Sequence, residues 1–228
     1  ETFLEAESLL RNERDLESER VIVLASEIFH PGVIGIAASK IVDTYHRPTV
    51  LIALEEGIGK GSGRSIPKFN LFKAFTNCSS HLIQFGGHAY AAGLSIAEEN
   101  VDAFRDAMNE AGHQFLTDED LIPEIKLDTT LDLSQINFPF YKSIALLEPF
   151  GAENPVPSFQ SQGVKIKEVK HMGKEKNHLR FRAVQGSGQI GVIGFNFASL
   201  FESLDITNDF FDIAYELHLN SWNGREKL

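Results

Sequence analysis

The sequence predicts an α/β domain followed by an all-β domain. Two observations lead to this expectation: the first half alternates apolar strand runs with amphipathic helix patterns, and the second half alternates apolar with charged residues at the period of a β-strand. Between the halves lies a polar stretch with a proline, which is typical of a domain boundary. We expect a connecting helix at residues 1–20, an α/β domain at 21–116, a linker at 117–127 and a β domain at 128–228.

A strand–helix–strand unit opens the first domain. Residues 21–25 and 49–54 are apolar runs like those of buried central strands. Between them, the residues that recur at helical spacing are Val33, Ile36, Ala37, Ile41 and Tyr45. This order predicts a right-handed parallel crossover.

The rest of the first domain is rich in glycine. Residues 57–65 (GIGKGSGRS) are interpreted as a flexible segment. Asn70 is expected to cap a helix of about 15 residues, which a Gly-Gly-His turn at residues 86–88 closes. A short strand at 93–96 and a helix around 101–111 complete the domain.

The second domain contains a hairpin pattern. Residues 164–170 and 178–183 each alternate apolar with basic side chains, on either side of a turn at 172–177. A break in the alternation at Glu168 predicts a β-bulge, and Phe181 is expected to face the core. Further elements are expected as strands at 190–195 and 210–219 and a short helix at 198–204. Short twisted strands with one helix favour a Greek-key barrel of the oligonucleotide-binding (OB) type, whose last strand is expected to be incomplete at Leu228.

Composition bounds the class of protein. The formal net charge of −11 argues against a surface that binds nucleic acid as a whole, yet residues 164–182 carry seven Lys or Arg against two Glu. Residues 1–20, with seven acidic and three basic side chains, are interpreted as a solvated helix. A single cysteine, Cys78, and the lack of a signal peptide or a membrane-spanning run favour a cytoplasmic setting without a membrane partner. Because the chain begins at Glu1, we expect it to be part of a longer protein.

Two clusters could bind an anionic group such as phosphate. Gly86 and Gly87 allow the backbone to approach a ligand, and His88 can donate a hydrogen bond into the space they leave. The second cluster offers a guanidinium suited to bidentate phosphate contacts and two hydroxyls, in the run Ser62, Gly63, Arg64 and Ser65. The alternative, from these residues alone, is an ordinary turn and a solvated loop arginine.

A third cluster is the basic side of the hairpin. Its four basic side chains could follow a nucleic-acid backbone, and they are Lys165, Lys167, Arg180 and Arg182. Phe181, Tyr215 or Trp222 would be available to stack on bases. The alternative is that strands alternate apolar with basic residues for solubility alone.

Several kinds of catalytic site are missing from the sequence. It has no Cys-x-x-Cys or His-x-x-x-His spacing for zinc and no aspartate cluster for two divalent metals. It also lacks a nucleophile elbow and a phosphate loop. We therefore expect no metal site in this chain, and a chain that cannot catalyse alone.

Several motifs resemble a known family. The stretches 30–38, 61–65 and 85–93 resemble the DHHA1 domain of the RecJ family of single-strand-specific DNA exonucleases. Residues 147–155 are similar to the segment that opens the OB domain of that family, and 220–224 to its penultimate turn. The resemblance covers nearly the whole chain from about residue 20.

The resemblance implies an activity for a longer protein. RecJ enzymes degrade single-stranded DNA from 5′ to 3′ in repair and recombination, with Mn²⁺ or Mg²⁺ held by an N-terminal DHH domain that is absent here. Arg64, Ser62 and His88 would hold substrate phosphates facing that domain. The implied partners are single-stranded DNA, the DHH domain of the same chain and, as a further candidate, a single-stranded-DNA-binding protein. Two positions depart from the family pattern, with His30 at a frequent tryptophan and Glu153 at a usual glycine.

Two other functions compete with this interpretation. The chain could be a non-catalytic DHHA1 and OB scaffold in a repair or replication complex, which would need no DHH domain upstream. A small-nucleotide phosphatase or oligoribonuclease of the same superfamily would have no barrel after residue 120, and the strand patterns at 164–195 argue against it.

Overall fold

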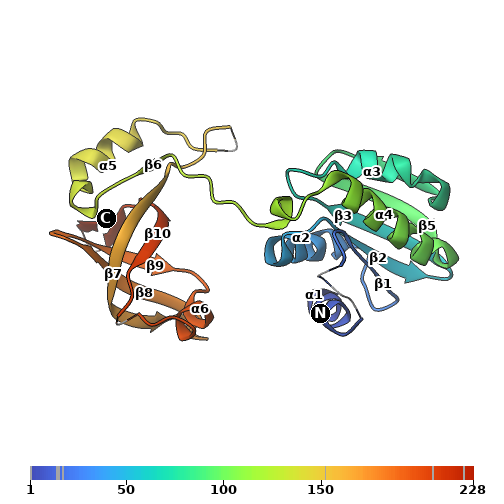
Figure 1. Ribbon diagram of the computed structural model, residues 1–228, viewed down its shortest axis with the longest axis horizontal. Coiled ribbons are helices and arrows are strands. Elements are labelled where there is room, and N and C mark those ends of the chain that lie inside the picture. Colours follow the sequence, from blue (N-terminus) through green and yellow to red (C-terminus); the bar gives the residue numbers. More distant parts are fainter. Residues whose placement is uncertain (1, 14–15, 17, 152, 207, 223) are drawn as a thin grey trace. The chain divides into compact units, whose positions relative to one another are not determined.

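The computed structural model describes residues 2–13, 16, 18–151, 153–206, 208–222 and 224–228. The chain divides into two compact units, residues 1–123 and 124–228. The division falls inside the stretch expected to be a linker. Each unit has hydrophobic clusters of its own, so the two are described separately (Figure 1).

The first unit is a five-stranded mixed sheet between two layers of helices. Its longer elements are α1 (Thr2–Glu13), β1 (Ile22–Ser26), α2 (Ile34–Tyr45), β2 (Thr49–Glu55), β3 (Ile58–Arg64), α3 (Leu71–Asn77), β4 (Gln84–Gly87), β5 (Ala91–Ala97) and α4 (Val101–Phe115). The strand order is β1-β2-β3-β5-β4. Only the β1–β2 pair is parallel, as expected from the strand–helix–strand pattern, and the other pairs are antiparallel.

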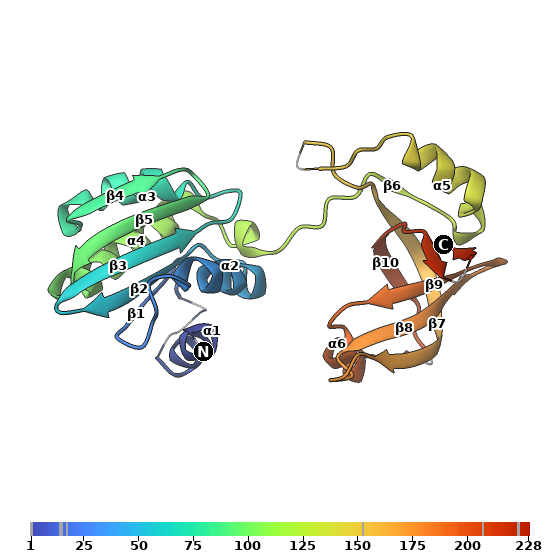
Figure 2. The same ribbon diagram turned by 180° about the vertical axis from the view of Figure 1, so that it is seen from behind.

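Two hydrophobic cores hold this sheet. One joins β1, β2 and β5 to α3 and α4, with Phe75 and Phe104 fully buried in edge-to-face contact. The other joins β1 and β2 to α1 and α2 on the opposite face. Figure 2 shows β3, β5 and β4 side by side in front of α3 and α4, with α2 beside them. The α2 side of β5 and β4 is therefore open within this unit.

The helices differ in part from the sequence expectations. In α1, Ala6 and Leu10 are fully buried against α2, so this helix is part of the unit's core and not a solvated segment. In α2, the buried residues include Ile34 and Ala38, whereas Ile36 is 64% exposed. The expected apolar face was therefore rotated by about one helical position.

The glycine-rich stretches were assigned to the wrong structure. Residues 58–64 form a central strand, β3, instead of a flexible segment. Asn70 does cap a helix, since its side chain accepts a hydrogen bond from the Lys73 amide, but α3 ends at Asn77 and a short 3₁₀ turn follows. Gly86 and Gly87 belong to the edge strand β4 and do not form a turn that closes the helix.

The second unit is an open sheet with flanking helices. Its elements are β6 (Thr129–Thr130), α5 (Phe138–Ala145), β7 (Ser158–Met172), β8 (His178–Gln185), β9 (Gly188–Gly194), α6 (Ala198–Glu202), β10 (Phe211–Glu216), β11 (Asn220–Trp222) and β12 (Arg225–Lys227). The sheet order is β10-β7-β8-β9, with β6 beside β7. In the described residues β9 and β10 are not paired with each other, so the expected closed all-β barrel is not confirmed. The unit is of mixed α and β content.

The hairpin β7–β8 agrees with the sequence in detail. The pairing shifts between Lys167 and Lys170, and Glu168 has a φ of 55°, which together mark the expected bulge. Phe181 is 5% exposed and packs in the core of the unit with the apolar residues that alternate along both strands, Val164, Ile166, Leu179 and Ala183.

Candidate phosphate-binding site

Arg64 ends β3, and its guanidinium packs on the first turn of α2. Arg64 Nη1 donates to Ser62 Oγ at 3.1 Å and to the Gly63 carbonyl at 2.8 Å. A Cβ added to Gly35, in that first turn, would lie 2.8 Å from Arg64 Nη2 and 3.1 Å from Ser62 Oγ. A side chain at Gly35 would therefore displace both groups. Gly35 had no predicted role, although a glycine inside a strong helix pattern is a signal of close approach.

The glycines of β3 lie on the face of the sheet that packs against the core, and its polar side chains lie on the opposite face. A Cβ at Gly61 would lie 2.7 Å from Leu94 Cδ1, and one at Gly63 would lie 2.5 Å from Leu71 Cδ2. Because successive side chains of a strand point to opposite faces, Ser62 and Arg64 lie on the α2 side of the sheet. Gly63 thus serves packing and does not face the predicted site.

The neighbouring strands leave this polar face bare. Gly93 of β5 pairs with Ser62 on one side and with Gly86 of β4 on the other. A Cβ at Gly86 would meet no described atom within 4 Å, and one at Gly93 would meet only the Gly61 carbonyl at 3.6 Å. The floor beside Ser62 is therefore exposed backbone that a ligand can approach closely.

His88 lies in the same row as Arg64, two strands away. Arg64 pairs with Ala91, and the His88 amide donates to the Ala91 carbonyl at 2.8 Å. With neighbouring strands about 4.8 Å apart, the backbones of Arg64 and His88 are about 10 Å apart. The His88 side chain is exposed. The structure thus brings Arg64, Ser62 and His88 to one end of one open sheet face.

The remaining predicted residues of this site, Ser65 and Gly87, stabilise the local backbone and do not face a ligand. Ser65 Oγ donates to the Phe69 carbonyl at 2.7 Å, and the Ser65 amide donates to the Tyr90 carbonyl. Gly87 has a φ of 140°, and a Cβ there would lie 2.5 Å from the Ala91 carbonyl oxygen. These contacts shape the β3–α3 and β4–β5 connections that carry Arg64 and His88.

The basic hairpin presents its cations on the solvent side, but not all of them are free. Lys167 lies directly opposite Arg182, and both Lys167 and Arg180 are exposed. Arg182 donates to Glu168 Oε2 at 3.1 Å and to Gln189. The Lys165 ammonium lies 4.8 Å from the ring centroid of Phe210. Glu168 therefore neutralises part of the predicted basic surface.

Two of the three aromatic residues proposed for base stacking, Phe181 and Tyr215, are held within the unit. Phe181 is buried, and the Tyr215 hydroxyl is hydrogen-bonded to Ser161 Oγ at 2.8 Å, while burial raises the pKa of Tyr215. The side chain of Trp222 lies outside the described part of the chain. The most exposed aromatics near the hairpin are instead Phe195 and Phe210, at 69% and 64% exposure, which the alternation of charge did not single out.

Metal-binding clusters, a reactive thiol and membrane-spanning helices are not found among the described residues. The described residues contain no cluster of three His, Cys, Asp or Glu that could hold a metal ion. Burial raises the pKa of Cys78 to about 11, which keeps the thiol protonated and unreactive. None of the described helices is long and apolar enough to cross a membrane.

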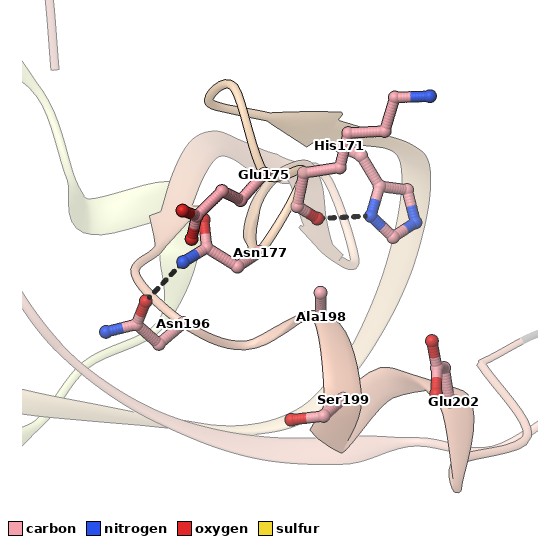
Figure 3. A pocket seen from close by; sticks show the side chains of 8 residues that line it. His171, Glu175, Asn177, Asn196, Ala198, Ser199 and Glu202 are labelled. Atoms are coloured by element: carbon pink, nitrogen blue, oxygen red, sulfur yellow. Dashed lines mark hydrogen bonds between the residues drawn. The ribbon is translucent and has the colours of Figure 1, made fainter. Parts of the chain in front are cut away.

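A cavity of about 550 Å³ lies elsewhere, on the second unit. Figure 3 shows its wall, where Glu175 and Asn177 from the β7–β8 turn lie across from Ser199 and Glu202 of α6. His171 completes the side near the turn and bonds the Lys176 carbonyl at 3.0 Å. Two carboxylates make this lining a poor match for phosphate, and no sequence-predicted site residue contributes to it.

Comparison with known proteins matches the two units separately. The family described as the DHHA1 domain matches residues 18–113, and the family described as the RecJ OB domain matches residues 127–228. The chain is therefore built from a DHHA1 domain followed by a RecJ OB domain. It belongs to the RecJ family.

Individual relatives support this assignment over most of the chain. The single-stranded-DNA-specific exonuclease RecJ of Bacillus subtilis is 36% identical over 211 residues, which are 92% of this chain and 27% of that protein. The RecJ of Haemophilus influenzae is 34% identical over 91% of this chain and 37% of its own length. A solved structure of RecJ from Thermus thermophilus in complex with Mn²⁺ is 30% identical, with a TM-score of 0.75 over 97% of this chain and 32% of that one. The chain thus spans about a third of the relatives it matches.

Proposed function

We propose that this chain is the substrate-binding part of an exonuclease that degrades single-stranded DNA from 5′ to 3′ in repair and recombination. The observation that carries the proposal is the open glycine floor with Arg64, Ser62 and His88 around it, in a chain of the RecJ family. The relatives reported above are named as single-stranded-DNA-specific exonucleases. No observation favours a non-catalytic scaffold.

The DHHA1 face has the chemistry of a phosphate site. Arg64 supplies a guanidinium that no carboxylate of the described residues neutralises, and it sits beside the first turn of α2, the positive end of a helix dipole. Ser62 and His88 add a hydroxyl and an imidazole at the same end of the sheet. A phosphate between Arg64 and His88 would lie over Ala91, whose methyl group is small, and beside the bare backbone of Gly93 and Gly86.

The RecJ OB domain is proposed to bind the rest of the strand. Lys167 and Arg180 are exposed on the outer side of β7 and β8 and can neutralise backbone phosphates. Lys165 and Arg182 lie on the same two strands. Lys165 contacts the ring of Phe210, and Arg182 forms an ion pair with Glu168. The interaction is expected to weaken as salt rises, because counterion release supplies its electrostatic part.

The metal and the protein partners are proposed to lie outside this chain. The described residues do not fit a metal site, and solved RecJ relatives are complexes with Mg²⁺ or Mn²⁺. We assign the ion to a DHH domain of the parent protein, and this chain's residues to holding the substrate. A single-stranded-DNA-binding protein stays a proposed partner that no contact described here supports.

Turnover of the parent enzyme tests the proposed site. Replacing His88 by Ala should lower the turnover of 5′-phosphorylated single-stranded DNA by about 10²-fold, the usual effect of removing one donor to a charged reacting group. The melting temperature should stay unchanged, because the His88 side chain is exposed. His113→Ala, on the exposed side of α4, is the matched control. Equal turnover of the two variants would contradict the role of His88.

A further inference from the structure

The open face of the DHHA1 sheet continues beyond the proposed phosphate site. We propose that Lys60, together with the side-chain pair of Gln84 and Ser95, forms a second row of contacts for the sugar–phosphate backbone of single-stranded nucleic acid. The bound strand then runs along β3 from Arg64 to Lys60. This inference rests on the proposed function and adds to it three binding residues and a direction.

The register of three strands sets this second row. Lys60 pairs with Ser95 of β5, and Ser95 pairs with Gln84 of β4. The row is parallel to the one that contains Arg64, because Arg64 and Lys60 are four residues apart on the same strand. At about 3.4 Å per residue the two rows are about 14 Å apart. The spacing fits contacts to separate phosphates of one strand.

The space between the rows holds a single side chain of these three strands, that of Ser62. The middle row consists of Ser62, Gly93 and Gly86, of which only Ser62 has a side chain. The open space above Gly86 and Gly93 allows a ligand to lie against the backbone from one row to the other. Figure 2 shows this stretch of β3, β5 and β4, where no helix crosses in front of it.

The side chains of the second row are suited to phosphate and are available. Lys60 is exposed and makes no ion pair with any residue that the structure describes. Gln84 Nε2 and Ser95 Oγ lie 3.4 Å apart, and both are donors that can turn to an anion. A packing role would bury Lys60 or pair it with a carboxylate, and the structure shows neither.

Charge complementarity identifies the occupant as a polyanion. β3, β4 and β5 carry Lys60 and Arg64 and no carboxylate, in a protein with a net charge of −11. The acidic side chain of the adjoining strand β2 is Glu55, which lies at the strand's end and pairs with Ile58. Cations gathered on carboxylate-free strands favour a nucleic-acid backbone over an acidic or apolar protein surface.

Ligands of two lengths distinguish contacts of the second row from contacts of the Arg64 row, because only the longer ligand can reach both rows. The ¹⁵N-labelled chain is titrated with 5′-phosphorylated thymidine and with 5′-phosphorylated tetrathymidylate, and dissociation constants are read from the amide shifts of β3, Gly86 and Gly93. Lys60→Ala should weaken tetranucleotide binding about 3- to 10-fold and reduce the salt slope by about 0.7, the loss of one phosphate contact. Binding of the mononucleotide should not change. Lys73→Ala, on α3 over the opposite face, removes the same charge as a control.

The results for Lys60→Ala and Arg64→Ala test the second row and the proposed phosphate site separately. If Lys60→Ala weakens both ligands equally, or no more than Lys73→Ala does, the second row is refuted. If Arg64→Ala also leaves both ligands bound as in the unmodified chain, the proposed phosphate site itself fails. Gln84→Ala in place of Lys60→Ala should show the same length dependence with a smaller effect.

Discussion

At the scale of single residues, the DHHA1 sheet uses glycine for two opposite purposes. Gly61 and Gly63 face the core, where neighbouring side chains already occupy the place of a Cβ. Gly86 and Gly93 face open space, where a Cβ would meet little or nothing. Gly61 and Gly63 let the helices pack closely on the sheet. Gly86 and Gly93 leave the backbone of the polar face uncovered by side chains. The same residue type therefore has a structural role on one face and a proposed binding role on the other.

Two alanine substitutions test this division. Gly61→Ala places a Cβ 2.7 Å from Leu94 Cδ1 and should destabilise the first unit by about 1–3 kcal/mol, the usual cost of overpacking a core. Gly86→Ala should change the free energy of unfolding by less than about 0.5 kcal/mol. It should nevertheless weaken nucleotide binding, because the methyl group stands on the floor that the ligand contacts. Urea unfolding and an NMR titration measure the two effects. A destabilised Gly86→Ala, or one that binds normally, would contradict the assignment.

At the scale of elements, the sequence predicted patterns set by packing and missed those set by backbone proximity. The parallel β1–β2 pair and the bulged β7–β8 hairpin follow from apolar periodicity, which the structure confirms. β3 was missed because glycine is depleted in strands and was interpreted as a loop. Its alternation of Gly59, Gly61 and Gly63 with polar residues was nevertheless a strand period.

The candidate site was predictable in its residue types but not in its arrangement. Arg64 and His88 were chosen because their side chains suit phosphate, and the register of β3, β5 and β4 then places them in one row. The helix pattern around Gly35 signals a close approach, but the partners of that approach, Ser62 and Arg64, could not be predicted from local sequence because they lie far along the chain on a strand. The ion pair of Arg182 depends likewise on the bulge that turns Glu168 toward it.

The Glu168 bulge gives a prediction for the basic hairpin. Glu168→Gln should free Arg182 from its ion pair, and single-stranded DNA should then bind the chain about 2- to 3-fold more tightly at low salt, with a salt slope larger by about 0.7. Glu175→Gln, in the turn that follows, removes an equal charge away from Arg182. Fluorescence anisotropy at several salt concentrations compares the two. Equal effects would mean that net charge alone, and not the release of Arg182, governs binding.

At the scale of the whole molecule, the chain consists of two units with separate cores. The DHHA1 domain buries its apolar residues within residues 1–123, and the RecJ OB domain within residues 124–228. Residues 122–130 between the cores are all exposed, and residues 123–127 have no regular secondary structure. Ile122 and Ile125 are exposed there at 61% and 71%, so neither core is closed by the segment. Each unit should therefore keep its fold when this segment is cut.

Limited proteolysis tests that independence directly. Trypsin should first cleave after Lys126, because a protease needs an extended, exposed backbone and residues 123–127 provide one. The products, residues 1–126 and 127–228, should resist further digestion and each show a cooperative unfolding transition. Lys126→Gln should slow the first cut while leaving the other sites untouched. First cleavage at Lys174 or Lys176 in the β7–β8 turn would contradict the accessibility of residues 123–127, and rapid loss of both products would show that the two units depend on each other for stability.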